Sequence, residues 1–320
     1  MKELEELDKE VEQIRTNNVM GADFLSNWAI ELIKKYILIK KEIPKQKFYN
    51  ELKDFSIKLI NTRPSMAPFF SKISYFLYEI NELGKKDINF TEFLIGITSI
   101  HKNMKKIDDA AQNKINKIIL DKVPDNSVVL THSYSSITTN ALKYLVKNRK
   151  NIEFIVTESR PINEGRLVVK ELINYAPITY ILDSAIGYCM KQKKVNFILL
   201  GADTVTIDGD LINKVGTYPL AVLARDLKSP IYSLCNKWKF NVREFVDKKI
   251  IIESRPSSEV WTPNLKESKN LTIKNYYFDI TPGNLITSYI TGSGEIQPEK
   301  IKEIIHDKFP VEWIKDNFKF

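Results

Sequence analysis

The chain of 320 residues contains few of the residues that build disulfide frameworks or metal centres. It has two cysteines, Cys189 and Cys235, which lie far apart without a Cys-x-x-Cys spacing, and three histidines in all. This scarcity argues against structural disulfides and gives no support for a metal site. No run of 18 apolar residues occurs, and the first residues are acidic and helical rather than signal-like. We therefore expect a cytoplasmic protein with no membrane segment.

Two nucleotide-binding patterns are also missing. The sequence has neither a Gly-x-Gly-x-x-Gly fingerprint nor a Walker A loop, so we expect no cofactor. The net charge of +8 could attract a polyanion, but no stripe of lysine and arginine interleaves with aromatic residues. The composition therefore favours solvated surface lysines over a nucleic-acid interface.

Apolar residues at helical spacing dominate the first 120 residues. Leu4, Leu7, Val11 and Ile14 mark a first helix. The same spacing predicts further helices at about 22–41, 45–60, 66–83 and 90–119. We therefore predict a helical N-terminal domain over residues 1–120.

From residue 121 onward the pattern alternates between short apolar runs and helical stretches. The five runs are 127–130, 153–156, 178–182, 195–200 and 230–234. This alternation is typical of a parallel sheet flanked by helices, and it predicts an α/β fold with a Rossmann-like domain over residues 121–320. A further strand is expected at 250–252. Thr281 followed by Pro282 predicts a capped helix that runs to about Ile290.

Polar residues follow the predicted strands. They are Thr131-His132-Ser133, Glu158-Ser159-Arg160, Asp183-Ser184, Asp203, and Asn236 with Lys237 and Lys239. In a parallel sheet, ligands bind beyond the carboxyl ends of the strands, so these residues predict one polar rim that holds the ligand pocket. A lone histidine beside a strand seldom acts without an orienting partner. We therefore interpret His132 as buried and hydrogen-bonded rather than as a base.

The stretch Asn213-Lys214-Val215-Gly216-Thr217 is expected to open a helix. Backbone N–H groups at a helix start, a glycine, a hydroxyl and a lysine charge together suit a phosphate. Structural alternatives remain open for other rim residues. Asp203 could satisfy backbone N–H groups at a strand end, while Arg160 and Lys239 could pair with Glu158 and Asp203.

Several strings occur in a fixed order along the chain. They are Thr62-Arg63-Pro64-Ser65-Met66, Leu130-Thr131-His132-Ser133-Tyr134-Ser135, Thr157-Glu158-Ser159-Arg160-Pro161, Glu164-Gly165-Arg166, Leu182-Asp183-Ser184-Ala185-Ile186-Gly187-Tyr188, Gly201-Ala202-Asp203, Asp208-Gly209, Asn213-Lys214-Val215-Gly216-Thr217, Trp238-Lys239-Phe240 and Asp279-Ile280-Thr281-Pro282. Together they resemble the family of translation initiation factor 2B alpha, beta and delta subunits. That family also contains methylthioribose-1-phosphate isomerase and archaeal ribose-1,5-bisphosphate isomerase.

The resemblance implies a helical N-terminal domain, a Rossmann-like C-terminal domain with an oligomer interface, and a homodimer that can build a hexamer. In the isomerases a cysteine follows the Thr-His pair and works with the aspartate of Gly-Ala-Asp. Here these positions are Ser133 and Asp203. The positions that surround the sugar phosphate in the isomerases are matched by Gly21, Arg63, Arg160, Asn213, Lys214, Gly216, Thr217 and Lys239.

Two functions follow as alternatives. The first is a regulatory, non-catalytic initiation factor 2B subunit of archaeal type that contacts initiation factor 2 or a sister subunit and binds a sugar phosphate or nucleotide. The second is an aldose–ketose isomerase of a phosphorylated pentose such as ribose 1,5-bisphosphate, with Asp203 and Ser133 as its catalytic residues. A serine hydroxyl has a far higher pKa than a thiol, which favours the first interpretation. Nucleic-acid binding ranks last.

Overall fold

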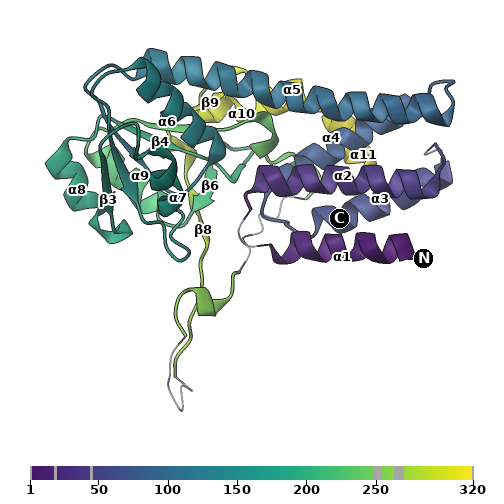
Figure 1. Cartoon of the computed structure of the whole chain (residues 1–320), viewed down its shortest axis with the longest axis horizontal. Coiled ribbons are helices and arrows are strands. Elements are labelled where there is room, and N and C mark those ends of the chain that lie inside the picture. The colour runs from purple at the N-terminus through teal and green to yellow at the C-terminus, as the bar shows by residue number, and fades with distance from the viewer. Residues whose placement is uncertain are drawn as a thin grey trace. The chain divides into compact units, whose positions relative to one another are not determined.

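The computed structural model describes residues 2–17, 20–43, 46–247, 252, 254–262 and 270–318. The chain forms two compact units (Figure 1). The first, here called the helical unit, comprises residues 1–109, 237–251 and 302–320, and the second, the sheet unit, comprises residues 110–236 and 252–301. Contacts therefore do not divide the chain at one point near residue 120. Two later segments pack with the N-terminal helices instead.

The helical unit is built from α-helices with apolar inner faces. Its elements are α1 (Lys2–Thr16), α2 (Ala22–Lys40), α3 (Gln46–Ile60), α4 (Ala67–Gly84), the first part of α5 (Phe90–Lys122), η2 (Lys237–Lys239), η3 (Val242–Phe245), α10 (Ile301–Lys308) and α11 (Val311–Asn317). The helices predicted for the first 120 residues are confirmed, with ends that differ by a few residues. Helix α2 packs against α1, α3 and α4, and Leu25, Phe69 and Phe76 are fully buried.

The sheet unit contains a seven-stranded sheet in the order β10-β9-β7-β4-β1-β2-β3, in which only β10 runs antiparallel. Its strands are β1 (Val128–Thr131), β2 (Glu153–Thr157), β3 (Ile178–Ile181), β4 (Phe197–Leu200), β7 (Ile231–Leu234), β9 (Ser288–Thr291) and β10 (Gly294–Ile296). A smaller antiparallel sheet joins β5 (Thr204–Val205), β6 (Leu211–Lys214) and β8 (Phe278–Thr281) in the order β5-β6-β8. The predicted α/β class, a helical region followed by a mostly parallel sheet, is confirmed.

Helices cover the large sheet. They are α6 (Ser136–Asn148), α7 (Gly165–Leu172), α8 (Ile186–Lys193) and α9 (Thr217–Asp226), with short 3-10 turns η1 (Asp183–Ala185), η4 (Ser257–Glu259), η5 (Gly283–Leu285) and η6 (Pro298–Lys300). The end of α5 packs with α6 and α7 over the sheet, where Ile119, Leu142 and Phe154 belong to one buried cluster. Right-handed crossovers place α6 and α7 on one face, because the chain moves outward from β1 to β3 and only then returns to β4.

This return creates a topological switch point between β1 and β4. Strands β2 and β3 lie on one side of β1, whereas β4, β7 and β9 lie on the other. In open α/β sheets the crevice at such a point, outside the carboxyl ends of the strands, is the usual ligand site. Ser133 follows β1 and Asp203 follows β4, so the topology brings the two predicted catalytic residues to this edge.

Two local predictions are wrong, and a third falls mostly on residues that the structure does not describe. The helix predicted through Ile290 is wrong, because after η5 the segment Ser288–Thr291, which contains Tyr, Ile and Thr, forms β9 and pairs with β7. The helix expected to open at Asn213 begins only at Thr217, since Asn213 and Lys214 end strand β6. Of the strand expected at 250–252, residues 250 and 251 lie outside the described part of the chain.

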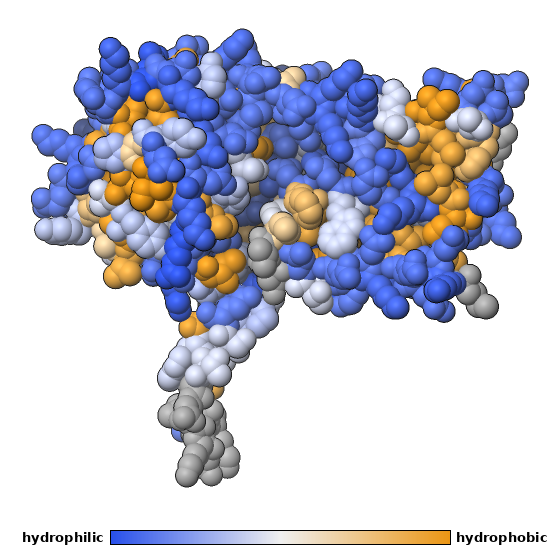
Figure 2. All heavy atoms as spheres, viewed as in Figure 1, coloured by the Kyte–Doolittle hydropathy of each residue, from blue (hydrophilic) through white to orange (hydrophobic). Residues whose placement is uncertain are grey.

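The face shown in Figure 2 is largely hydrophilic, with apolar side chains gathered on the sheet unit in the region of α7 and α9 and also on the helical unit. Leu167 and Ile173, at α7, are 42% and 58% exposed. Across the part of the chain that the structure describes, no helix is both long and apolar enough to cross a membrane.

Candidate functional site

The loop after β1 is anchored by His132, whose imidazole is buried. Its Nδ1 lies 2.6 Å from Thr157 Oγ1 and its Nε2 lies 3.0 Å from the carbonyl oxygen of Val215. Because a carbonyl oxygen only accepts, Nε2 carries the hydrogen and Nδ1 accepts from the Thr157 hydroxyl. Burial lowers the pKa of His132 and keeps the ring neutral. The prediction that His132 is a buried, hydrogen-bonded residue is confirmed.

Gly216 packs directly on this histidine. Its backbone has φ +105°, and a Cβ at this position would lie 3.1 Å from Cε1 and Nε2 of His132. Both the left-handed backbone and the close approach therefore require glycine. The turn between β6 and α9 is in this way fixed against the loop that carries Ser133.

Ser133 lies in a left-handed conformation with φ +68°, which aims its backbone N–H and its hydroxyl at two different partners. The N–H donates to Ser159 Oγ at 2.8 Å, and Oγ donates to Glu164 Oε2 at 2.7 Å. The Ser159 N–H in turn donates to Asp183 Oδ1 at 2.8 Å. Hydrogen bonds thus link the ends of β1, β2 and β3 into one rim.

Glu164 immediately precedes α7 and contacts two hydroxyl donors and one ammonium group. Its Oε2 accepts from Ser133 and lies 3.0 Å from Lys214 Nζ, while its Oε1 accepts from the Tyr277 hydroxyl at 2.8 Å. The next residue, Gly165, has no room for a side chain, because a Cβ there would lie 1.9 Å from the carbonyl oxygen of Thr157. Close packing against β2 therefore holds Glu164 at the sheet edge.

Lys214 is buried at the end of β6, with its side chain 2% exposed. Its Nζ lies 3.0 Å from the centroid of the Tyr277 ring. Burial lowers the pKa of Lys214, and the charges of Glu164 and Asp203 oppose that shift. Asp203 donates its backbone N–H to the Ile212 carbonyl at 3.1 Å. We call Ser133, Glu164, Asp203, Lys214 and Tyr277 the strand-end cluster.

The start of helix α9 binds a carboxylate of the chain itself. Asp279 Oδ2 accepts from the backbone N–H of Gly216 at 2.8 Å and of Tyr218 at 3.1 Å. Burial raises the pKa of Asp279 to about 6, although the backbone N–H groups oppose the shift. The position at which we predicted a phosphate is therefore occupied by Asp279.

Asn213 and Thr217 serve the same turn. Asn213 Nδ2 donates to Thr217 Oγ1 at 3.0 Å, and Thr217 Oγ1 donates to the Lys214 carbonyl at 2.7 Å. Both side chains are buried. These contacts give each residue a structural role, and their assignment as phosphate ligands stays a prediction.

Arg160 lies at the exposed end of the rim. Its backbone N–H donates to Asp183 Oδ2 at 2.8 Å, and its guanidinium donates to the Val260 carbonyl at 3.0 Å. The ion pair with Glu158 that we considered as an alternative does not occur among the described residues. Most of the Arg160 side chain thus faces solvent.

Three of the predicted ligand-binding residues belong to the helical unit. Gly21 is exposed just before α2. Arg63 is buried and donates to the carbonyl oxygens of Ile14, at 3.2 Å, and Asn17, so it caps the end of α1. Lys239 is buried, with its Nζ 3.9 Å from Asp23 Oδ2.

Sequence reasoning assigned no role to Glu164, Tyr277 or Asp279. Glu164 and Asp279 each begin a sequence string that contributes to the family resemblance, so both could have been identified as candidate site residues. Tyr277 could not, because its contact with Glu164 joins positions 113 residues apart.

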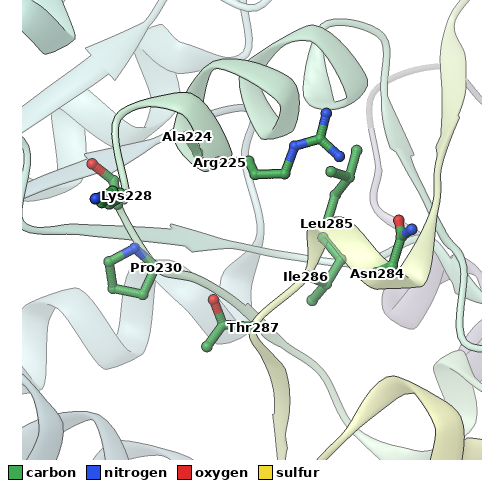
Figure 3. Close-up of a pocket in the computed structure, with 9 residues that line it drawn as sticks. Ala224, Arg225, Lys228, Pro230, Asn284, Leu285, Ile286 and Thr287 are labelled. Atoms are coloured by element: carbon green, nitrogen blue, oxygen red, sulfur yellow. The ribbon is translucent and has the colours of Figure 1, made fainter.

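A separate pocket of about 330 Å³ lies in the sheet unit between the end of α9 and the segments that precede β7 and β9 (Figure 3). Arg225, Lys228, Pro230, Leu285 and Thr287 contribute to its lining. These segments enter the sheet at the opposite ends of the strands from Ser133 and Asp203. No predicted site residue lines this pocket, and within the described ranges no group of three or more His, Cys, Asp or Glu side chains could hold a metal ion.

The chain is similar to proteins of known family and structure. The model of the initiation factor 2 subunit family matches residues 18–298. The chain is 29% identical to the ribose 1,5-bisphosphate isomerase of Methanocaldococcus jannaschii, over 97% of each chain. It is 30% identical to the protein of the same name from Archaeoglobus fulgidus, over 95% of this chain and 94% of the relative. Among solved structures, the translation initiation factor eIF-2B of Pyrococcus horikoshii OT3 matches with a TM-score of 0.74 at 21% identity, over 92% of this chain and 98% of that chain.

Proposed function

We propose that this chain, which belongs to the initiation factor 2 subunit family, is an aldose–ketose isomerase that acts on a phosphorylated pentose such as ribose 1,5-bisphosphate. Two relatives with that name are similar over nearly the whole chain. The strand-end cluster carries the proposal, because a hydroxyl, two carboxylates and a buried cation gather beside the switch point. Asp203 and Ser133, the pair marked by the family resemblance, are both members of this cluster.

The reaction requires proton transfers at carbon and at oxygen. In a pentose phosphorylated at C1, the hydrogen on C2 moves to C1, the C2 hydroxyl loses its proton, and the ring oxygen gains one as the ring opens. A positioned acid or base contributes roughly 10²- to 10⁴-fold to such a step. We assign the transfer at carbon to Asp203. We assign the exchange at oxygen to Ser133, whose hydrogen-bonded partner Glu164 can take up the proton that a serine alone holds too tightly.

The exposed Arg160 is the cation that we assign to a substrate phosphate in the sheet unit. Its guanidinium is held at the rim by one carbonyl oxygen, and its remaining donors suit a phosphate. The buried Asn213 and Thr217 would act on the substrate only through the turn that they shape.

Turnover of ribose 1,5-bisphosphate by the purified protein tests the proposal. Asp203→Asn should lower the rate by roughly 10²- to 10⁴-fold, because the amide cannot accept a proton. Asp208→Asn, which changes an exposed carboxylate in the β5–β6 turn, is the matched control and should leave the rate unchanged. Absence of turnover in the wild type, or an unchanged rate in Asp203→Asn, would overturn the assignment.

A second candidate is a regulatory initiation factor 2B subunit. It is favoured by Ser133, which stands where the resemblance to the isomerases places a thiol, and by Asp279, which fills the start of α9. In this case the chain would bind a sugar phosphate or nucleotide without turnover, and would act as a homodimer or hexamer on initiation factor 2 or a sister subunit. A pulldown at micromolar concentration with the alpha subunit of initiation factor 2 tests this candidate, and a failure to bind would count against it.

A further inference from the structure

The contacts of Glu164 are those that a bound anion would make. Its two oxygens hold the Ser133 hydroxyl at 2.7 Å, the Tyr277 hydroxyl at 2.8 Å and the Lys214 ammonium at 3.0 Å. Two hydroxyl donors and one ammonium charge that converge on a pair of oxygens would suit a phosphate equally well. The carboxylate therefore stands in the place of a ligand anion.

Lys214 and Glu164 differ in how deeply their side chains are buried. The Lys214 side chain is 2% exposed, whereas that of Glu164 is 18% exposed. Lys214 also lies against the Tyr277 ring, with Nζ 3.0 Å from its centroid. The carboxylate is thus the more accessible member of the pair, and an anion from solvent has to displace it to reach the ammonium.

A carboxylate already neutralises Lys214. Glu164 lies 3.0 Å from its Nζ, and the negative charge of Asp203 also acts on it. A dianion brought next to Lys214 would meet the Glu164 carboxylate at short range in a poorly solvated place.

We propose that Glu164 is the specificity-determining residue of this site, because its carboxylate keeps phosphate away from Lys214 and leaves the strand-end cluster to the hydroxyl-bearing carbons of the sugar. This inference rests on the proposed function in taking a phosphorylated pentose as the ligand. A carboxylate accepts hydrogen bonds from sugar hydroxyls, and the Ser133 hydroxyl beside it donates or accepts. The phosphate groups then lie outside the cluster.

Glu171, on the same helix α7, offers a matched control. It accepts from the Tyr134 hydroxyl at 2.9 Å and pairs with Lys143, so it also joins a tyrosine and a lysine. The Lys143 side chain is 31% exposed, however, in contrast to the buried Lys214. Removing the charge of Glu171 therefore frees no buried cation.

The experiment measures binding of inorganic phosphate and of ribose 1,5-bisphosphate by isothermal titration calorimetry. Glu164→Gln removes the charge, keeps one acceptor oxygen for one of the two hydroxyls of Ser133 and Tyr277, and offers an amide N–H to the other. It should bind phosphate at least tenfold more tightly than the wild type. Glu164→Asp keeps the charge and should show no such gain. Glu171→Gln should bind as the wild type does, and thermal unfolding of every variant verifies that it is folded.

The outcomes separate this inference from the proposed function. If the wild type binds the pentose but Glu164→Gln gains no affinity for phosphate, the inference is overturned and the proposed function survives. If Glu164→Gln gains phosphate affinity but no form of the protein binds the pentose, the specificity role stands and the proposed function fails. If nothing binds to any form, both are overturned. An equal gain in Glu171→Gln would also overturn the inference, because the effect would then not depend on Lys214.

Discussion

Among the described residues, Lys72 is the most deeply buried lysine of the helical unit and Lys214 that of the sheet unit, and the two differ in their partners. Lys72, on α4 of the helical unit, lies 3.2 Å from Asn27 Oδ1, 3.4 Å from Asp23 Oδ1 and 3.4 Å from Asp108 Oδ2. Lys214, in the sheet unit, has one close carboxylate, Glu164, at 3.0 Å.

The difference in partners distinguishes Lys72, which has a structural role, from Lys214, to which we assign a role in binding. The partners of Lys72 come from α2 and α5, so the ammonium joins three helices, and Trp238 Nε1 also donates to Asp108 at 2.6 Å. Glu164 instead lies at the edge of the sheet, where it also holds the Ser133 hydroxyl. Loss of Lys72 should therefore reduce stability, whereas changes at Lys214 and Glu164 should alter what the protein binds.

The largest effect is expected for Lys72→Met. The substitution leaves Asp23 and Asp108 without their shared cation, and burial already raises the pKa of Asp108. Removal of one partner of a buried ion pair costs about 3–5 kcal/mol. Urea unfolding should show this loss, while the folded variant should bind ribose 1,5-bisphosphate as the wild type does. A loss below about 1 kcal/mol would contradict a structural role for Lys72.

The second largest effect is a dependence of stability on pH that arises from Asp279 in the sheet unit. The pKa of Asp279 is raised to about 6, so the folded protein holds this proton more tightly than the unfolded chain. The contribution of Asp279 to stability is therefore greatest below the ordinary carboxyl pKa and falls as the pH rises through about 6, by up to roughly 3 kcal/mol.

Asp279→Asn removes this titration. The free energy of unfolding of the wild type minus that of the variant should decrease between pH 4 and pH 7, and chemical denaturation at several pH values measures it. Subtraction of the variant cancels the other carboxylates. A difference that does not change with pH would show that the carboxylate at the start of α9 is not destabilised by burial.

The smallest effect on stability is expected for Lys214→Met, the counterpart of Lys72→Met. Glu164 is partly exposed and can be hydrated when its cation is lost, so we expect a cost of about 1–3 kcal/mol, below that for Lys72. The uncompensated carboxylate should weaken binding of ribose 1,5-bisphosphate about tenfold, a change of about 1.4 kcal/mol. Calorimetry and urea unfolding measure the two quantities. Equal stability losses in the two lysine variants would remove the distinction between the units.

Local patterns in the sequence predicted much of this fold. The helical spacing of Leu7, Val11 and Ile14 corresponds to the buried face of α1, and the short apolar runs correspond to the parallel strands. The tail was mispredicted because a Thr-Pro pair also occurs between two strands, and the pairing of β9 with β7 depends on residues far apart in the chain.

The candidate site was predictable only in part. The strand ends identified Ser133 and Asp203, because position along a parallel sheet fixes the edge at which such residues lie. Lys214 was predicted as part of a phosphate-binding turn at the start of a helix. Which groups satisfy one another was not predictable. Asp279 binds the start of α9 from 63 residues away, and no local pattern encodes such a pairing.

The most direct test is a crystal structure of the protein with ribose 1,5-bisphosphate bound. We expect the sugar at the switch point between β1 and β4, with C2 or its hydroxyl within roughly 2.6–3.2 Å of Asp203 and Ser133. We also expect that Glu164 still pairs with Lys214 and that the phosphates lie outside the strand-end cluster. A sugar bound in the pocket of Arg225 and Lys228, or a phosphate bound to Lys214, would contradict the proposed site.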